Sequence, residues 1–98
     1  MKAIILSILL TFSVLATYAV PFTLRNSSTK SIYLKIPGVM NPNLSPMSNS
    51  GVDLAVGQKI YFFVKKKKYI LLEVTEEYAG KKVAVDKLIK ARKKELGL

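Results

Sequence analysis

The sequence predicts a small, mainly β fold: an antiparallel sandwich or partly open barrel of about five or six strands with one C-terminal amphipathic α-helix. Three observations lead to this fold class. Short segments alternate apolar and polar residues between turns rich in Pro, Gly, Asn and Ser. The end of the chain has apolar residues at helical spacing. The 98 residues include no cysteine, so packing without disulfides must hold a domain of this size.

The N-terminal segment, residues 1–19, is typical of a secretory signal peptide. Lys2 precedes an apolar run, and small side chains come before a cleavage point after Ala19. We therefore expect a signal helix, removed to leave one domain over residues 20–98 that is secreted or periplasmic. The alternative is an uncleaved N-terminal membrane anchor, because the run carries no charge as far as Val20 and about eighteen residues can cross a bilayer.

Two alternating segments follow the leader. Pro21–Asn26 alternates apolar and polar residues, and Ser31–Ile36 does the same, with Tyr33 and Lys35 opposite three aliphatic side chains. Pro37-Gly38 ends the second segment. Because only a short polar link joins the two strands, we expect them to pair as a hairpin.

Residues 39–50 contain two prolines, three asparagines and three serines without periodicity. This composition predicts a loop, which we expect to cross between sheets with Val39, Leu44 and Met47 as its anchors in the core. Gly51–Val56 then alternates as a strand and is followed by a turn.

The next segments, Lys59–Val64 and Tyr69–Val74, flank four consecutive lysines, Lys65–Lys68, and predict a hairpin with a four-residue loop. A two-residue type I′ turn is less favoured, because lysine disfavours a positive φ. The expected register sets Val64 opposite Tyr69. Both faces of this hairpin are then apolar, so we expect both to be covered, one by the other strands and one by the C-terminal helix or a partner molecule.

An acidic turn and a short extended segment lead into the last element, a helix predicted over residues 86–96. Asp86 is the expected N-cap and Gly97 the expected C-cap. The expected apolar stripe of this helix consists of Val85, Leu88, Ile89, Ala91 and Leu96.

The side chains that most catalytic sites use are missing from the sequence. It has no His and no Cys, which excludes His-based acid–base catalysis, Cys nucleophiles and metal sites built on these ligands. Glu76 and Glu77 are adjacent and would diverge, and no glycine-rich phosphate loop is present. We therefore expect no enzyme activity, no cofactor, no metal and no small-molecule substrate.

The charge balance indicates the kind of partner. The chain has 16 Lys and Arg against six Asp and Glu, a formal net charge of +10, and such a field attracts polyanions. The same lysines could serve only to keep the surface hydrated and to prevent aggregation of strand edges. Sequence-specific nucleic-acid recognition is not expected, because only Tyr61 and Tyr69 lie beside the lysine runs. The candidate residues for binding an anionic partner are Lys65, Lys66, Lys67, Lys68, Lys81, Lys82, Lys90, Arg92, Lys93 and Lys94.

These observations predict a non-catalytic binding or accessory module that contacts an anionic envelope or extracellular component. The alternative is a protein–protein interaction subunit or homo-oligomer that buries the apolar hairpin 59–74 or the helix stripe. Three segments, Ile36–Pro46, Gly57–Phe62 and Leu88–Gly97, resemble those of small exported bacterial proteins with no known activity. The resemblance implies a bacterial envelope or extracellular setting. Separately, if the leader is cleaved we expect at most peripheral membrane contact.

Overall fold

The structure, a computed structural model, describes residues 19–98. The predicted signal helix lies outside these residues. Within them the elements, in chain order, are β1 (Ala19–Asn26), β2 (Ile32–Lys35), β3 (Asn43–Leu44), β4 (Ser48–Ala55), β5 (Lys59–Val64), β6 (Lys67–Glu73), the 3₁₀ turn η1 (Glu76–Tyr78), β7 (Lys82–Ala84) and α2 (Val85–Leu96).

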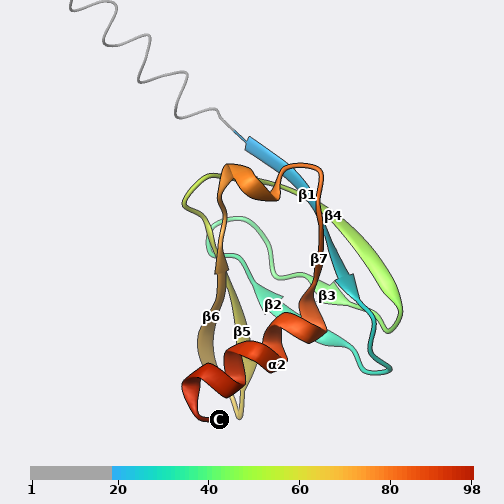
Figure 1. The fold of residues 1–98 in the computed structure, drawn as a ribbon, viewed down its shortest axis with the longest axis vertical. Helices are drawn as coiled ribbons and strands as arrows, with labels where there is room; N and C mark the ends of the chain where they lie inside the picture. Colours follow the sequence, from blue (N-terminus) through green and yellow to red (C-terminus); the bar gives the residue numbers. More distant parts are fainter. Residues whose placement is uncertain (1–18) are drawn as a thin grey trace, which may run out of the picture.

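Two sheets face each other across the core (Figure 1). The three-stranded sheet has the order β4-β1-β7, and the four-stranded sheet has the order β3-β2-β5-β6. β1 pairs antiparallel with β4 over its whole length, from Ala19 opposite Ala55 to Asn26 opposite Ser48, and parallel with β7 on its other side. The predicted β-rich fold with one C-terminal helix is confirmed.

The core consists of aliphatic and aromatic side chains from both sheets. Alternate residues of β1, from Val20 to Asn26, are buried, as the period of two in the sequence predicts. Phe62 of β5, 1% exposed, and Phe22 of β1, 4% exposed, are the largest of the buried side chains. The buried apolar residues are Val20, Phe22, Leu24, Leu34, Ile36, Leu44, Val52, Leu54, Ile60, Phe62, Leu71, Leu72, Val74 and Val85.

β1 and β2 do not form a hairpin, so that prediction is wrong. They belong to different sheets, and the link between them crosses from one sheet to the other. The buried side chain of Asn26 fixes this crossing. Its Nδ2 donates hydrogen bonds to the carbonyl oxygens of Lys30 (2.8 Å) and Leu44 (3.0 Å), and its Oδ1 accepts one from the backbone N–H of Ser28 (2.9 Å). The Asn26 amide thus bonds to backbone N–H and carbonyl groups. In a hairpin, such groups would bond to the backbone of the turn itself.

Residues 39–50 cross between the sheets as predicted, but they are not wholly irregular. The chain turns at Pro37-Gly38 and returns alongside β2, where β3 pairs with it. β4 then begins inside the predicted loop. Leu44 is buried, whereas Val39 and Met47 are 51% and 60% exposed, so Leu44 is the only one of the three predicted anchors that reaches the core. A two-residue strand is too short to show a period in the sequence.

β5 and β6 form the predicted hairpin, with a shorter turn than expected. Lys65 and Lys66 alone make the loop, at φ values of 51° and 70°, and Val64 pairs with Lys67. Positive φ at both central residues gives the type I′ turn, whose twist matches that of the strands. This match overrides the preference of lysine for negative φ. The register is therefore displaced by two residues from the predicted one, which leaves side chains near the turn on their predicted faces.

Beyond a bulge, the faces of the hairpin differ from the prediction. The register shifts between Ile60 and Tyr61, and Leu71 and Leu72 of the opposing strand are both buried. An additional residue in one strand re-aims the side chains that follow it, so Leu72 joins the core and leaves the outer face. That outer face is not covered: Phe63 is 44% exposed. The prediction that α2 covers this second face is therefore wrong, and cover by a partner molecule stays a prediction.

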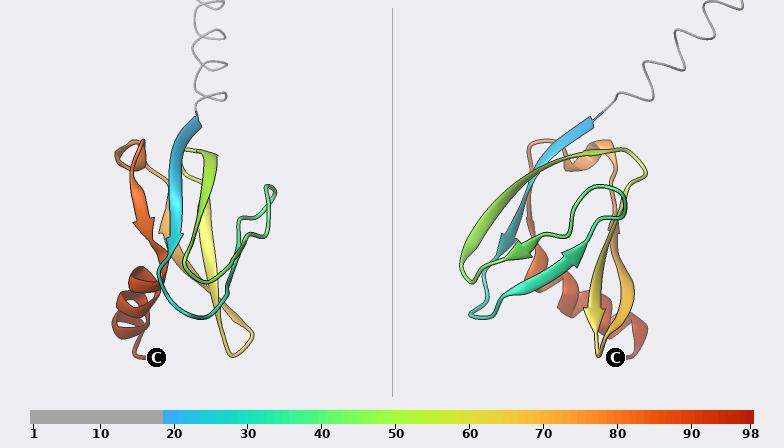
Figure 2. Two further views of the ribbon diagram at one scale, coloured as in Figure 1. Left: turned by 90° about the vertical axis from the view of Figure 1, so that its right-hand side faces the viewer. Right: turned by 180° about the vertical axis from the view of Figure 1, so that it is seen from behind.

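α2 closes the side of the sandwich between β7 and β6, the edge strands of the two sheets (Figures 1 and 2). Val85 is buried, and Leu88 and Ile89 pack against the core. Ala91 is exposed and Leu96 is 42% exposed, so the last part of the predicted stripe is not buried. No helix within residues 19–98 combines the length and the apolarity needed to cross a membrane.

The two predicted caps of α2 have different outcomes. Gly97 is confirmed as the C-cap, because it adopts a φ of 73° and its N–H points to the carbonyl oxygens of Lys93 and Lys94. Asp86 is not the N-cap, a position that Ala84 holds. The helix begins directly after β7, which puts Asp86 in the first turn, where its Oδ1 accepts a hydrogen bond from the backbone N–H of Ser27 at 3.0 Å.

Candidate anion-binding surface

The predicted basic residues fall into two groups. The β5–β6 hairpin turn and the C-terminal end of α2 lie at the same end of the molecule (Figures 1 and 2). Lys81 and Lys82 lie away from this end, where the chain leaves η1 and enters β7. We call the first group the basic tip; its members, all exposed, are Lys65, Lys66, Lys67, Lys68, Lys90, Lys93 and Lys94.

Most of the acidic residues lie away from the basic tip or are bonded within the fold. Glu73 is at the far end of β6 from the hairpin turn, and Glu76 and Glu77 belong to η1 at that same far end (Figure 1). Near the tip, the carboxylate of Glu95 is paired with the guanidinium of Arg92. The acidic side chains of this small domain are therefore segregated from the tip, which presents an excess of cations. The far end carries both signs, because Lys59 lies opposite Glu73 and Lys81 and Lys82 follow η1.

Arg92 is part of the fold rather than of the free basic surface. Its Nε donates a hydrogen bond to the carbonyl oxygen of Ile70 at 3.0 Å, which ties α2 to the edge of β6. Its Nη1 contacts Glu95, and its side chain is 27% exposed. A guanidinium bonded in this way has fewer donors left for an anion, so we remove Arg92 from the set of candidate ligand-binding residues.

Lys81 and Lys82 border a separate apolar groove of about 450 Å³ between β7 and α2. Lys87, which sequence reasoning did not single out, is on the same rim. The apolar lining consists of Tyr78, Val83, Ala84, Leu88 and Ala91. This second basic region is thus separate from the tip.

The uncovered outer side of the four-stranded sheet carries aromatic and basic side chains together. Lys35 of β2 lies opposite Tyr61 of β5, which in turn lies opposite Ile70 of β6. On the same face, two residues further along β5, Phe63 lies opposite Lys68. Tyr33 is 64% exposed and Ile70 is 38% exposed. We call this surface the aromatic face; its members are Tyr33, Lys35, Tyr61, Phe63, Lys68 and Ile70.

One lysine belongs to both the basic tip and the aromatic face. Lys68 places its Nζ 4.6 Å from the centroid of the Tyr61 ring, within the range of a cation–π interaction. The contact holds the ammonium beside a partly exposed ring instead of leaving it extended into solvent. Positive charge and π surface are therefore adjacent on this face.

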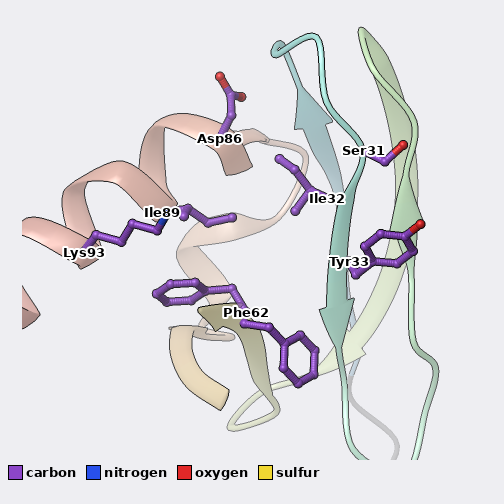
Figure 3. Close-up of a pocket in the computed structure, with 8 residues that line it drawn as sticks. Ser31, Ile32, Tyr33, Phe62, Asp86, Ile89 and Lys93 are labelled. Atoms are coloured by element: carbon purple, nitrogen blue, oxygen red, sulfur yellow. The ribbon is translucent and has the colours of Figure 1, made fainter. Parts of the chain in front are cut away.

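Tyr33 and Phe63 also line two hollows. The first, of about 320 Å³, lies between the start of β2 and α2, and both Lys93 and Asp86 are on its wall. Figure 3 shows Ile32 and Ile89 pointing toward each other across it. The second, of about 280 Å³, is lined by Lys35 and Asn41 as well as by the two rings. Tyr33 and Phe63 therefore line both hollows, and each hollow has a lysine on its wall, Lys93 in the first and Lys35 in the second.

Sequence reasoning missed most of the aromatic face, although its signal was present. The alternation in β2 already placed Tyr33 and Lys35 opposite the aliphatic side chains, and the alternation in β5 placed Tyr61 and Phe63 together. The error was to expect α2 as a cover over the second apolar face. In the structure α2 fills the gap between the sheet edges instead.

Within residues 19–98, no group of three or more His, Cys, Asp or Glu side chains is arranged to hold a metal ion.

Comparisons with protein-family models, with curated proteins and with solved structures found no match for this chain. The resemblance to small exported bacterial proteins stays a prediction.

Proposed function

We propose that the protein is a non-catalytic, exported binding module that holds an anionic polymer at the basic tip. The observation that carries this proposal is the segregation of charge: seven lysines gather at one end, while Glu73, Glu76 and Glu77 lie at the other. A solubilising surface needs no such separation, because charges of both signs can be interspersed over it. A segregated field raises the local concentration of a polyanion at one end.

Removal of the leader after Ala19 is compatible with this fold. Ala19 is exposed, and every buried apolar residue of the described core lies from Val20 onward. Without Lys2, the chain keeps 15 Lys and Arg against six acidic residues, a net charge of +9. We place this domain in the secreted or periplasmic space; an uncleaved leader would instead hold the same domain at a membrane surface.

Elution from a heparin column tests the proposal. We compare the parent protein with a triple variant of the tip, Lys65→Gln, Lys66→Gln and Lys67→Gln. The matched control is Lys81→Gln, Lys82→Gln and Lys87→Gln, which removes the same charge from the groove between β7 and α2. We expect the tip variant to elute at a clearly lower salt concentration than the control, because the tip makes the contact.

Equal shifts for the two triple variants would mean that net charge alone governs retention, and would contradict a binding site at the tip. Retention of the parent protein that is unchanged in about half-molar salt would also contradict it, since contacts driven by charge weaken steeply as salt rises.

A second candidate function is supported by the uncovered outer side of the β5–β6 hairpin. Exposed apolar side chains that gather on one face can bind another protein or a second copy of the chain. The helix stripe is a weaker candidate surface, because Val85, Leu88 and Ile89 already pack in or against the core. Light scattering over the micromolar range, together with crosslinking, tests this candidate; a strict monomer without a co-purifying partner would exclude it.

A further inference from the structure

We infer that the aromatic face binds single-stranded nucleic acid without sequence preference, stacking bases on Tyr33 and Phe63, while Lys68 over the Tyr61 ring contacts a phosphate. The inference rests on the proposed function, because it names the class of anionic polymer and adds a second contact surface beside the basic tip. Proteins that bind single strands in this manner combine a basic path for the phosphates with aromatic side chains for the bases. The structure brings both features together on one rigid sheet.

The rings are accessible and held by regular strands. Tyr33 is 64% exposed and Phe63 is 44% exposed, and Tyr61 is partly exposed. The face covers three strands, or about 10 Å at the usual spacing between neighbouring strands, which suits a few nucleotides. Because the rings stand on paired strands, little side-chain or loop entropy is lost when a base stacks on them.

Lysines border the rings on several sides. Lys35 lies opposite Tyr61, Lys68 lies opposite Phe63 with its Nζ over the Tyr61 ring, and Lys93 is on the wall of the first hollow. Lys68 lies in β6 shortly after the hairpin turn and so connects the aromatic face to the basic tip. A backbone that crosses the rings would thus meet ammonium groups on both sides, as phosphates require.

Other occupants fit this face less well. In a duplex the base faces are stacked inside the helix, so the rings would have no base to contact. In a symmetric dimer over this face, Lys35 and Lys68 of each chain would lie in the same interface, and like charges there oppose association. An acidic glycan would satisfy the lysines, but the six side chains of the face offer its hydroxyl groups few neutral polar partners. A nucleotide offers both the π face of its base and an adjacent phosphate.

Fluorescence anisotropy with labelled single strands tests the inference on the purified protein. The probes are an oligothymidylate of about eight nucleotides, within the usual range of site sizes, and an abasic strand with the same number of phosphates. We expect the thymidylate to bind more tightly than the abasic strand. Tyr33→Ala and Phe63→Ala should each weaken thymidylate binding by about 5- to 150-fold, the range of measured stacking contributions. Tyr33→Phe, which keeps the ring, should retain binding.

Met47→Ala is the matched control, because Met47 is an exposed apolar residue whose backbone N–H donates to the carbonyl oxygen of Ser28 in the link that follows β1; this variant should leave binding unchanged. Circular dichroism confirms that each variant is folded. Equal affinity for the two probes, or unchanged affinity in both alanine variants, would overturn the inference. If heparin binding still depended on the lysines of the tip in that case, the proposed function would be supported and only the nucleic-acid inference would be overturned. If the alanine variants weakened heparin binding but not thymidylate binding, the face would be a glycan site instead.

Discussion

Replacing Asn26 by alanine should strongly destabilise the fold. This side chain is fully buried, and it links β1 to the crossing that follows and to the segment around β3. Its Nδ2 lies within hydrogen-bond distance of three carbonyl oxygens, those of Lys30 (2.8 Å), Leu44 (3.0 Å) and Ser45 (3.2 Å). Its Oδ1 accepts from the backbone N–H of Ser28 at 2.9 Å and from the hydroxyl of the same residue at 2.7 Å.

The size of the effect follows from these bonds. At about 1 kcal/mol for each hydrogen bond, the whole set contributes at most about 5 kcal/mol to the free energy of unfolding. The groups of Ser28, Lys30 and Ser45 are partly exposed and can bind water in the variant, whereas the carbonyl of Leu44 takes part in a buried bond. We therefore expect a loss of about 2–4 kcal/mol, and a fall in the melting temperature of about 10–25 °C for a domain of this size.

Urea denaturation measures this loss of stability, and two further variants serve as comparisons. Asn43→Ala removes an exposed asparagine and should change the free energy of unfolding by less than about 0.5 kcal/mol. Asn26→Asp keeps the shape of the side chain but points carboxylate oxygens at carbonyl oxygens, and should destabilise at least as much as alanine. A loss below about 1 kcal/mol in Asn26→Ala, with an unchanged m-value, would refute the role of this amide in joining the two sheets.

Four further expectations follow from the same structure. Lys65→Asn with Lys66→Gly should stabilise the protein by about 1–2 kcal/mol in urea denaturation, because both positions have positive φ; a loss of stability would contradict the two-residue turn. Phe62→Ala should cost about 3–5 kcal/mol, as scanning calorimetry will show, whereas a cost near zero would contradict its place in the core. A chain that starts at Val20 should give the same β-rich circular dichroism spectrum after purification, and a disordered spectrum would contradict a core that begins at Val20. The logarithm of the thymidylate association constant should fall against the logarithm of salt concentration with a slope of about −2, the value for three phosphate contacts on a single strand; a slope near zero would contradict lysine–phosphate contacts.

The strands near the N-terminus show what the sequence can and cannot predict. The alternation in β1 predicted both the strand and its buried side, because the period of two is a local property. Its partner could not be predicted, since a short polar link fits a hairpin and a crossing between sheets equally well. The difference depends on Asn26, whose partners include the backbone of Leu44, 18 positions away.

The β5–β6 hairpin shows a different limit. Two apolar runs around four lysines were enough to predict the hairpin, but the register depends on whether Lys65 and Lys66 accept positive φ. The twist of the whole sheet decides that point, and twist is not visible in a short window of residues. The bulge that turns Leu72 inward likewise depends on pairing across the sheet.

The candidate site was predictable only in part. The lysine run at the hairpin turn and the basic helix were evident from the sequence, but their placement at one end of the molecule depends on the path of α2 between β7 and β6. The bond from Arg92 to the backbone of Ile70 depends on the same path. The aromatic face was overlooked because a doubly apolar hairpin was taken to be buried on both sides.

An NMR titration of the isotopically labelled protein with the oligothymidylate tests the central claim most directly, because it maps contacts on every strand at once. We predict that the amide signals of Tyr33, Phe63 and Lys68 shift with a common saturation curve, while those of Lys82 and Lys87 in the groove between β7 and α2 stay in place. Shifts confined to that groove, or no saturable shift at low salt, would contradict a basic tip and aromatic face that together hold a polyanion.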